Sequence, residues 1–182
     1  VFYFSDHGDM MGSHGLVGKS RPEEESSNIP LIIRYPTQIP QDVVSDALIS
    51  NVDFMPTLFG LLAIDVPDHV DGQDLSATLT GNQDHGADMV LLQFENNFFA
   101  ETPETKFRSV RAEHWLYTVF YANTHGQLFD LNEDSYQLEN RFDDPAHAVV
   151  QQRLHQQLEA KLNSINDDFF ERVTTYQSTV KE

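Results

Sequence analysis

The sequence predicts an α/β protein in which part of an α/β layer is followed by a small antiparallel sheet packed on a C-terminal helix. Two patterns support this fold class. Short apolar runs alternate with helical patterns in the first half, and from residue 88 several strand-like runs precede a long amphipathic stretch. We therefore expect two parts, residues 1–85 in the α/β layer and residues 86–182 in a C-terminal subdomain. A chain of 182 residues is long enough to bury a proper core.

The first half opens with the apolar run Val1–Phe4, which we expect to form a short buried strand. Polar residues and a glycine end this strand, and the glycine-rich segment 8–28 predicts a long functional loop. A second strand is predicted at Ile29–Pro36, between two prolines. The other elements expected here are a short strand at 46–50, a helix capped by Asp53, and a short helix that ends at Gly81.

The second half predicts an antiparallel sheet covered by one helix. Its helix should begin at Asp144 and Pro145, because Asp is a favoured N-cap and Pro is tolerated at the first helical position. The apolar positions follow three- and four-residue steps, so one helix face should pack on the sheet. These positions are Val150, Leu154, Leu158, Leu162 and Ile165. The predicted strands span residues 89–94, 107–111, 115–121 and 127–131.

Composition and charge exclude several classes of function. The chain has 11 Lys+Arg and 29 Asp+Glu, which gives a formal net charge of −18 and disfavours nucleic acid and anionic membranes as partners. It contains no cysteine, so disulfides, thiolate zinc sites and cysteine nucleophiles are excluded within this sequence. No apolar run is long enough to span a bilayer.

Asp6 and His7 are the first candidate site residues, because they follow the first predicted strand directly. Ligands of α/β folds gather at the carboxyl ends of strands, and Gly8 lets the backbone turn so that both side chains can converge. A carboxylate and a neutral imidazole would make half of a divalent-metal site. Lys19, in the same loop, could hold an anion as a point charge. The alternatives are a solvated Asp–His pair and an ordinary exposed lysine.

Read together, the motifs resemble the C-terminal portion of the type I sulfatases, which are arylsulfatase-like members of the alkaline phosphatase superfamily. The resemblance spans almost the whole chain and keeps the order of the family's landmarks. The segments that carry it are Ser5–Gly8, Gly12–Lys19, Ile29–Pro36, Asn51–Leu58, Val66–Leu75 with Gly81, Arg108–Arg111 and Gly126–Leu131.

The resemblance implies roles for particular residues. Asp6 and His7 match the family's second pair of metal ligands, and Lys19 matches the lysine that contacts the sulfate of the substrate during catalysis. His14 falls in a stretch that orders the loop, and we keep it as a minor candidate for substrate binding, together with His125 at a hairpin tip. The implied cofactor is a divalent metal, Ca²⁺ first and Mg²⁺ as the alternative.

The family's nucleophile is a formylglycine made from a C/S-x-P-x-R motif, and two further Asp ligands precede it. Neither is present in this sequence. Ser20–Glu24 comes nearest but ends in Glu where Arg is required, so we assign no nucleophile to this chain. The sequence starts with Val rather than Met, and we expect a missing N-terminal portion to supply the formylglycine. The chain alone should be inactive, and the exposed edge of its first strand predicts a homo-oligomer.

Three functions stay open at this point. The first is part of a sulfuric ester hydrolase that acts, in the complete enzyme, on a sulfated small molecule or sugar. The second is a phosphonate or phosphate ester hydrolase of the same superfamily, and the third is a non-catalytic remnant or interaction module. The resemblance suggests a periplasmic or secreted location.

Overall fold

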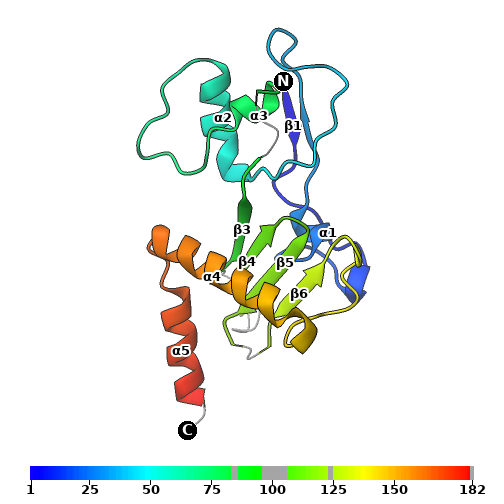
Figure 1. Ribbon diagram of the computed structural model, residues 1–182, viewed down its shortest axis with the longest axis vertical. Helices are drawn as coiled ribbons and strands as arrows, with labels where there is room; N and C mark the ends of the chain where they lie inside the picture. Colours follow the sequence, from blue (N-terminus) through cyan, green and yellow to red (C-terminus); the bar gives the residue numbers. More distant parts are fainter. Residues whose placement is uncertain (83–85, 96–105, 123–124, 181–182) are drawn as a thin grey trace. The chain divides into compact units, whose positions relative to one another are not determined.

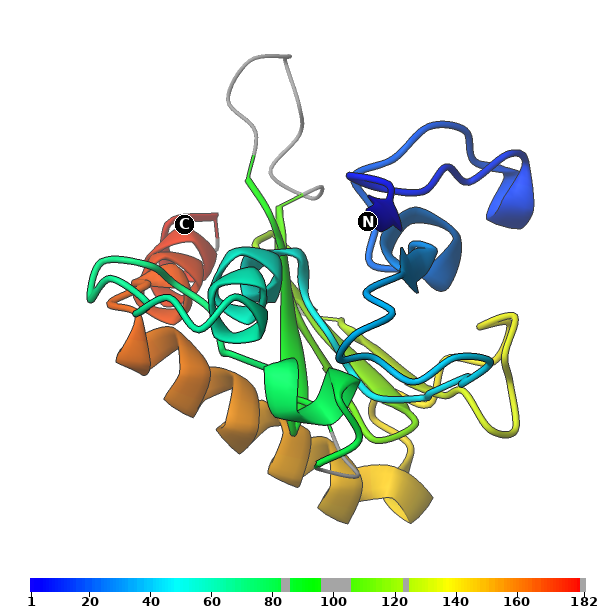
Figure 2. The same ribbon diagram turned by 90° about the horizontal axis from the view of Figure 1, so that it is seen from above.

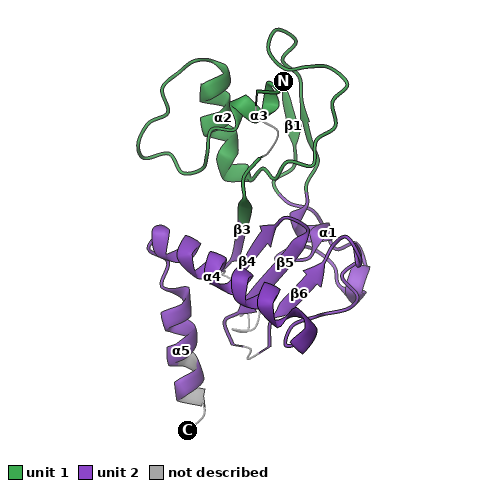
Figure 3. Cartoon of the chain, viewed as in Figure 1, with its two compact units in different colours: residues 1–6, 29–90 green, residues 7–28, 91–182 purple. Residues whose placement is uncertain are grey.

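The computed structural model describes residues 1–82, 86–95, 106–122 and 125–180 (Figure 1). They form two compact units (Figure 3). Unit 1 comprises Val1–Asp6 and Ile29–Val90, and unit 2 comprises His7–Asn28 and Leu91–Glu182. The long N-terminal loop therefore belongs to the same unit as the C-terminal sheet. The predicted division of domains at residue 85 stays a prediction.

Unit 1 contains a two-stranded antiparallel sheet of β1 (Phe2–Phe4) and β2 (Leu31–Ile33). We expected the first strand to be buried, but Tyr3 and Phe4 are 62% and 46% exposed, and Ile32 on β2 is 63% exposed. The difference has a simple physical reason. Among the described residues this sheet has only two strands, so its apolar side chains have few neighbours to cover them.

A 3₁₀ turn with a capping box precedes the helix of unit 1. As predicted, Asp53 is the N-cap residue of the helix Phe54–Leu61 by position, although its side chain makes no capping bond to that helix. Ser50 is the N-cap of the preceding 3₁₀ turn, and Asp53 is the third residue of that capping box. Asp53 Oδ2 accepts a hydrogen bond from the backbone N–H of Ser50 at 2.8 Å, and Oδ1 accepts one from Gln73 at 2.8 Å. No strand forms at 46–50. The helical elements of unit 1 are η2 (Asn51–Asp53), α2 (Phe54–Leu61) and α3 (Ser76–Leu79).

Unit 2 is built on a four-stranded sheet in the order β3-β4-β5-β6. β4 and β5 pair in antiparallel register with Ser109 opposite Thr118, and the hydroxyls of these two buried residues lie 2.8 Å apart. β5 pairs with β6 in the same sense. The strands are β3 (Met89–Phe94), β4 (Phe107–Ala112), β5 (Trp115–Phe120) and β6 (Gln127–Asp130).

The C-terminal helix begins as predicted. Asp144 Oδ1 accepts a hydrogen bond from Ala146 at 2.9 Å, and Pro145 occupies the first turn, η4 (Pro145–His147). α4 (Ala148–Ser164) then packs on β4 and β5, and both views show it running along one face of the sheet (Figures 1 and 2). Its leucines 154, 158 and 162 are 0–1% exposed. This arrangement confirms the predicted fold class of a mixed α/β chain with an antiparallel sheet and a C-terminal helix.

A further helix, α5 (Phe169–Val180), follows a short turn after α4. The sequence patterns described above do not indicate this helix. Phe169 is fully buried and Val173 is 7% exposed, so α5 is attached through its first two turns. Among the described residues, no helix combines the length and the apolar character that crossing a membrane requires.

Candidate functional site

The loop that carries the predicted site is folded onto α1 (Glu24–Ser27). The backbone N–H of Gly8 donates to the carbonyl of Ser26 at 2.9 Å. A Cβ on Gly8 would lie 2.0 Å from the carbonyl oxygen of Glu25, a distance that no side chain tolerates. Only glycine therefore permits this close approach, and the residue after His7 is held directly against the helix.

The C-terminal sheet holds α1 in turn. The backbone N–H of Glu24 donates to Gln137 Oε1 at 2.8 Å, which satisfies one of the free donors at the start of this short helix. Gln127 Nε2, at the beginning of β6, donates to Glu23 Oε1 at 2.9 Å. Arg111 Nε, on β4, donates to Glu24 Oε1 at 3.3 Å. Residues far along the chain thus position the loop that contains His7.

These contacts determine the tautomer of His7. Its Nδ1 lies 2.7 Å from the carbonyl oxygen of Gly8, and because a carbonyl can only accept, Nδ1 carries the proton and donates. Nε2 then has the lone pair and accepts from Lys19 Nζ, which lies 2.7 Å away. The structure therefore brings His7 and Lys19 together, with the lone pair of the imidazole Nε2 directed at the Lys19 ammonium.

Asp6 is the last residue of the first segment of unit 1. Its carboxylate accepts a hydrogen bond from Ser5 Oγ at 3.4 Å, and its backbone carbonyl accepts one from Asn51 Nδ2 at 3.1 Å. Asp6 and His7 have the donor chemistry of a divalent-cation site, one carboxylate oxygen and one imidazole nitrogen. They are incomplete as a metal site, because the described part of the chain contains no group of three or more such ligands.

Among the described residues, neither of the two minor candidates makes a hydrogen bond or ion pair with His7 or Lys19. His14 is exposed in the 3₁₀ turn η1 (Ser13–Gly15), with a backbone φ of 54° in the left-handed region. His125 is exposed between β5 and β6, and its Nδ1 lies 4.0 Å from Asp143 Oδ2. Their roles in substrate binding stay predictions.

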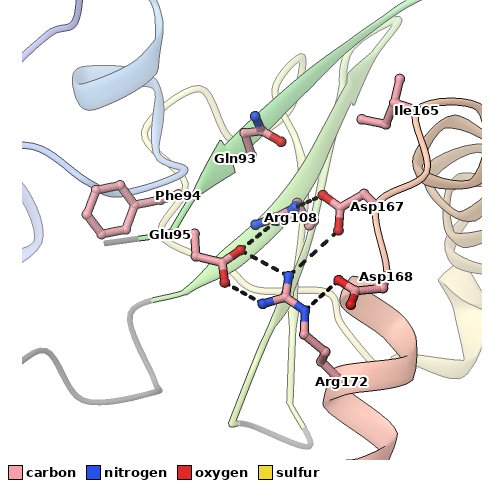
Figure 4. Close-up of a pocket in the computed structure, with 8 residues that line it drawn as sticks. All are labelled: Gln93, Phe94, Glu95, Arg108, Ile165, Asp167, Asp168 and Arg172. Atoms are coloured by element: carbon pink, nitrogen blue, oxygen red, sulfur yellow. Dashed lines mark hydrogen bonds and ion pairs between the residues drawn. The ribbon is translucent and has the colours of Figure 1, made fainter. Parts of the chain in front are cut away.

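A cavity of about 670 Å³ lies elsewhere in unit 2, between the end of β3, β4 and the start of α5 (Figure 4). Arg108, 4% exposed, donates through Nε to Asp167 at 2.7 Å and through Nη2 to Glu95 at 2.8 Å. Arg172 pairs with Glu95 and, at 2.7 Å, with Asp168. The hydrogen bonds from Arg172 and Arg108 hold the pKa of Glu95 at about 2. Because these charges satisfy one another, we interpret the cluster as an anchor for α5.

Sequence reasoning missed the residues that position His7. The role of Gly8 could have been predicted, since a glycine directly after a polar strand end permits close backbone contact. The contact between Gln137 and Glu24 could not have been predicted, because the two residues are 113 positions apart in the sequence and meet only in the folded chain. Gln127 and Arg111 were placed on strands, but their bonds to the loop could not be inferred.

An α/β layer whose first strand leads into an Asp–His pair and a lysine loop, followed by an antiparallel sheet and helix, is the architecture of the C-terminal part of a sulfatase of the alkaline phosphatase superfamily. The chain belongs to the sulfatase family. The profile described as "N-sulphoglucosamine sulphohydrolase, C-terminal" matches residues 12–164.

Individual proteins agree with this assignment. An ulvan-active sulfatase from Formosa agariphila is 34% identical over 178 residues, covering 94% of this chain and 34% of that protein. The structure of BT4656 in complex with its substrate, D-glucosamine-2-N,6-O-disulfate, matches with a TM-score of 0.83 at 27% identity, covering 92% of this chain and 34% of the other. The phosphonate monoester hydrolase of Agrobacterium radiobacter matches with a TM-score of 0.72 at 28% identity, covering 87% and 34%. The chain thus spans about a third of the length of these relatives.

Proposed function

We propose that this chain is the C-terminal part of an enzyme that hydrolyses sulfate esters of a small molecule or sugar. In this proposal Asp6 and His7 supply half of a divalent-cation site, and Lys19 contacts the sulfate group. The observation that carries it is the 2.7 Å contact between Lys19 Nζ and His7 Nε2, which brings an imidazole nitrogen and a positive charge to one point.

Each residue has a defined task in such a reaction. His7 is held as a neutral ligand because its other nitrogen donates to Gly8. The Lys19 ammonium stabilises the negative charge that increases on the leaving oxygen and the sulfate as the S–O bond breaks. Asp6 and His7 would hold part of the coordination shell of a divalent cation, Ca²⁺ first and Mg²⁺ as the alternative, which would supply positive charge to neutralise sulfate oxygens. Ca²⁺ prefers about six to eight ligands, so further ligands must come from outside this pair.

We infer that the chain is inactive alone and that a longer polypeptide supplies the formylglycine and the remaining acidic ligands. This is consistent with its covering only 34% of the ulvan-active sulfatase. The exposed apolar side chains of β1 and β2, Tyr3, Phe4 and Ile32, give the remaining polypeptide a surface to cover. Without that cover the same surface favours self-association into a homo-oligomer. A periplasmic or secreted location stays part of the proposal.

The test uses the complete open reading frame, including any coding sequence upstream of Val1, and the isolated chain beside it. We expect the complete protein to hydrolyse 4-nitrophenyl sulfate with added Ca²⁺, and the isolated chain to show no turnover. Lys19→Met should lower kcat/KM by about 10²- to 10³-fold, the usual loss for one group that stabilises developing charge. Lys161→Met, on α4, is the matched control and should leave kcat/KM unchanged. Equal rates for both variants would reject the role of Lys19.

A second candidate is hydrolysis of phosphonate or phosphate esters, which the match to the Agrobacterium radiobacter enzyme favours. The complete protein should be assayed in parallel with 4-nitrophenyl sulfate and 4-nitrophenyl phenylphosphonate. A higher kcat/KM for the sulfate supports our proposal, and a higher value for the phosphonate replaces it. If neither ester is hydrolysed and Ca²⁺ does not raise the melting temperature, the chain belongs to a non-catalytic remnant or interaction module.

A further inference from the structure

We propose that Lys19 occupies the metal-binding nitrogen of His7 until a divalent cation displaces it, so that cation binding releases the Lys19 ammonium for an anion. This inference rests on the proposed function, because it takes His7 as a metal ligand. It adds an order of events to the site, with the cation first and the anion second.

Lys19 and a metal ion would compete for the same nitrogen atom of His7. Nδ1 of His7 is committed to the Gly8 carbonyl at 2.7 Å, so the ring has a single lone pair, on Nε2. Lys19 Nζ lies 2.7 Å from that nitrogen. An ammonium has three donors and no acceptor, and therefore it cannot share the lone pair with a metal ion. The two cations also repel each other at such short range.

Lys19 is the partner that moves. Its side chain is exposed and has a flexible four-carbon stem, whereas His7 is fixed through Gly8, which is packed against α1. Displacement therefore costs one exposed hydrogen bond and leaves the imidazole in place. The released ammonium stays in the loop next to the bound cation, where an anion such as sulfate can be held by both.

A simpler explanation is that Lys19 weakens cation binding only through its charge. Arg21 separates these two explanations, because it carries the same charge two residues further along the loop. In the part of the chain that the structure describes, its side chain makes no hydrogen bond or ion pair with His7. Lys19→Met removes both the charge and the contact, and Arg21→Met removes a charge alone. The two variants form a matched pair.

The experiment is a Zn²⁺ titration of the ¹⁵N-labelled complete protein, followed through the imidazole Nε2 resonance of His7. Zn²⁺ is the probe because imidazole nitrogen is one of its usual ligands, and a His7→Gln variant assigns the signal. We expect Lys19→Met to reach half-saturation at about three- to tenfold lower Zn²⁺ than the unmodified chain, which is the effect of losing one exposed hydrogen bond of ordinary strength. Arg21→Met should stay within about twofold.

An unchanged midpoint for Lys19→Met, or an equal shift for Arg21→Met, overturns the inference. Inorganic sulfate gives a second readout, since it should shift the Lys19 side-chain resonances far more strongly after Zn²⁺ has been added than before. Equal shifts in both conditions also overturn it. These results are distinguishable from failure of the proposed function, because a chain without displacement could still belong to an active sulfatase. If His7 takes up no Zn²⁺ in any variant, its metal role is rejected as well.

Discussion

The guanidinium of Arg108 lies 2.7 Å from the carboxylate of Asp167, with only 5% and 11% of their side chains exposed. This pair connects the central strand β4 to the turn that precedes α5. The ring of Phe169 lies 4.8 Å from the same guanidinium, so the first residue of α5 is held by a cation–π contact as well. The short turn between α4 and α5 is thereby tied to the sheet.

Removing Arg108 should destabilise unit 2 strongly. We expect Arg108→Met to lower the free energy of unfolding by about 3–5 kcal/mol, because it leaves Asp167 and Glu95 without their buried partner. Urea denaturation followed by circular dichroism measures this change. Arg153→Met is the control, since Arg153 and Glu113 form an exposed pair, and it should cost less than about 1 kcal/mol. Similar losses for both variants would show that the Arg108 cluster is not an anchor.

Acid should weaken the same region through Glu95. Its pKa is held at about 2 in the folded chain, below the ordinary value of 4.5, mainly by hydrogen bonds from Arg172 and Arg108. A lowered pKa contributes stability that is fully present above pH 4.5 and is lost progressively as the pH falls towards 2. Melting temperatures measured across this range should fall more steeply for the unmodified chain than for Glu95→Gln. Parallel curves would contradict the assignment.

The leucine face of α4 should dominate the stability of its contact with the sheet. Leu158 is fully buried, and Leu158→Ala should lower the free energy of unfolding by about 2–5 kcal/mol through lost apolar burial and the cavity left behind. Leu138→Ala makes the same substitution at a side chain that is 74% exposed, and it should change stability by less than about 0.5 kcal/mol. Chemical denaturation of the two variants tests the comparison directly.

Gly8 should be essential to the position of His7. Gly8→Ala places a Cβ 2.0 Å from the Glu25 carbonyl, and the forced shift should cost about 1–3 kcal/mol. Gly15→Ala is a useful contrast, because its φ of 72° strains any side chain although no atom lies within 4 Å, and it should cost about 1 kcal/mol. Only the first variant should change the tautomer of His7, measured by imidazole ¹⁵N shifts. An unaltered spectrum in Gly8→Ala would show that the Gly8 contact does not position the ring.

Much of the fold could be predicted from local patterns. The sheet strands and the leucine face of α4 were readable because their periodicity is repeated over several residues, and the start at Asp144 was readable from the chemistry of caps. Asp53 could be placed at the N-cap of α2, but its bond to Ser50 in the capping box of η2 could not be inferred, because both residues are good capping residues and the sequence pattern does not decide which role each takes. α5 was missed because its attachment depends on Phe169 and Arg108, which meet only in the folded chain.

The candidate site was predictable as a set of residues but not as a geometry. Asp6, His7 and Lys19 could be selected because carboxylate, imidazole and ammonium in one loop are the types that metal and anion sites require. The tautomer of His7 and its contact with Lys19 could not be inferred. They depend on Gly8 lying against α1, and α1 depends on long-range bonds to the sheet.

The path of the chain between the two units has a consequence for how such genes can be divided and recombined. The polypeptide passes from one unit to the other at residues 6/7, 28/29 and 90/91, so no single crossover point separates them. Suppose that everything after residue 90 were exchanged with the corresponding part of a homologue. The exchange would replace Arg111, Gln127 and Gln137, which are the side chains that support the loop containing His7. A recombinant joined there would inherit its loop from one parent and the support of that loop from the other, and compatibility at α1 would decide whether the hybrid works.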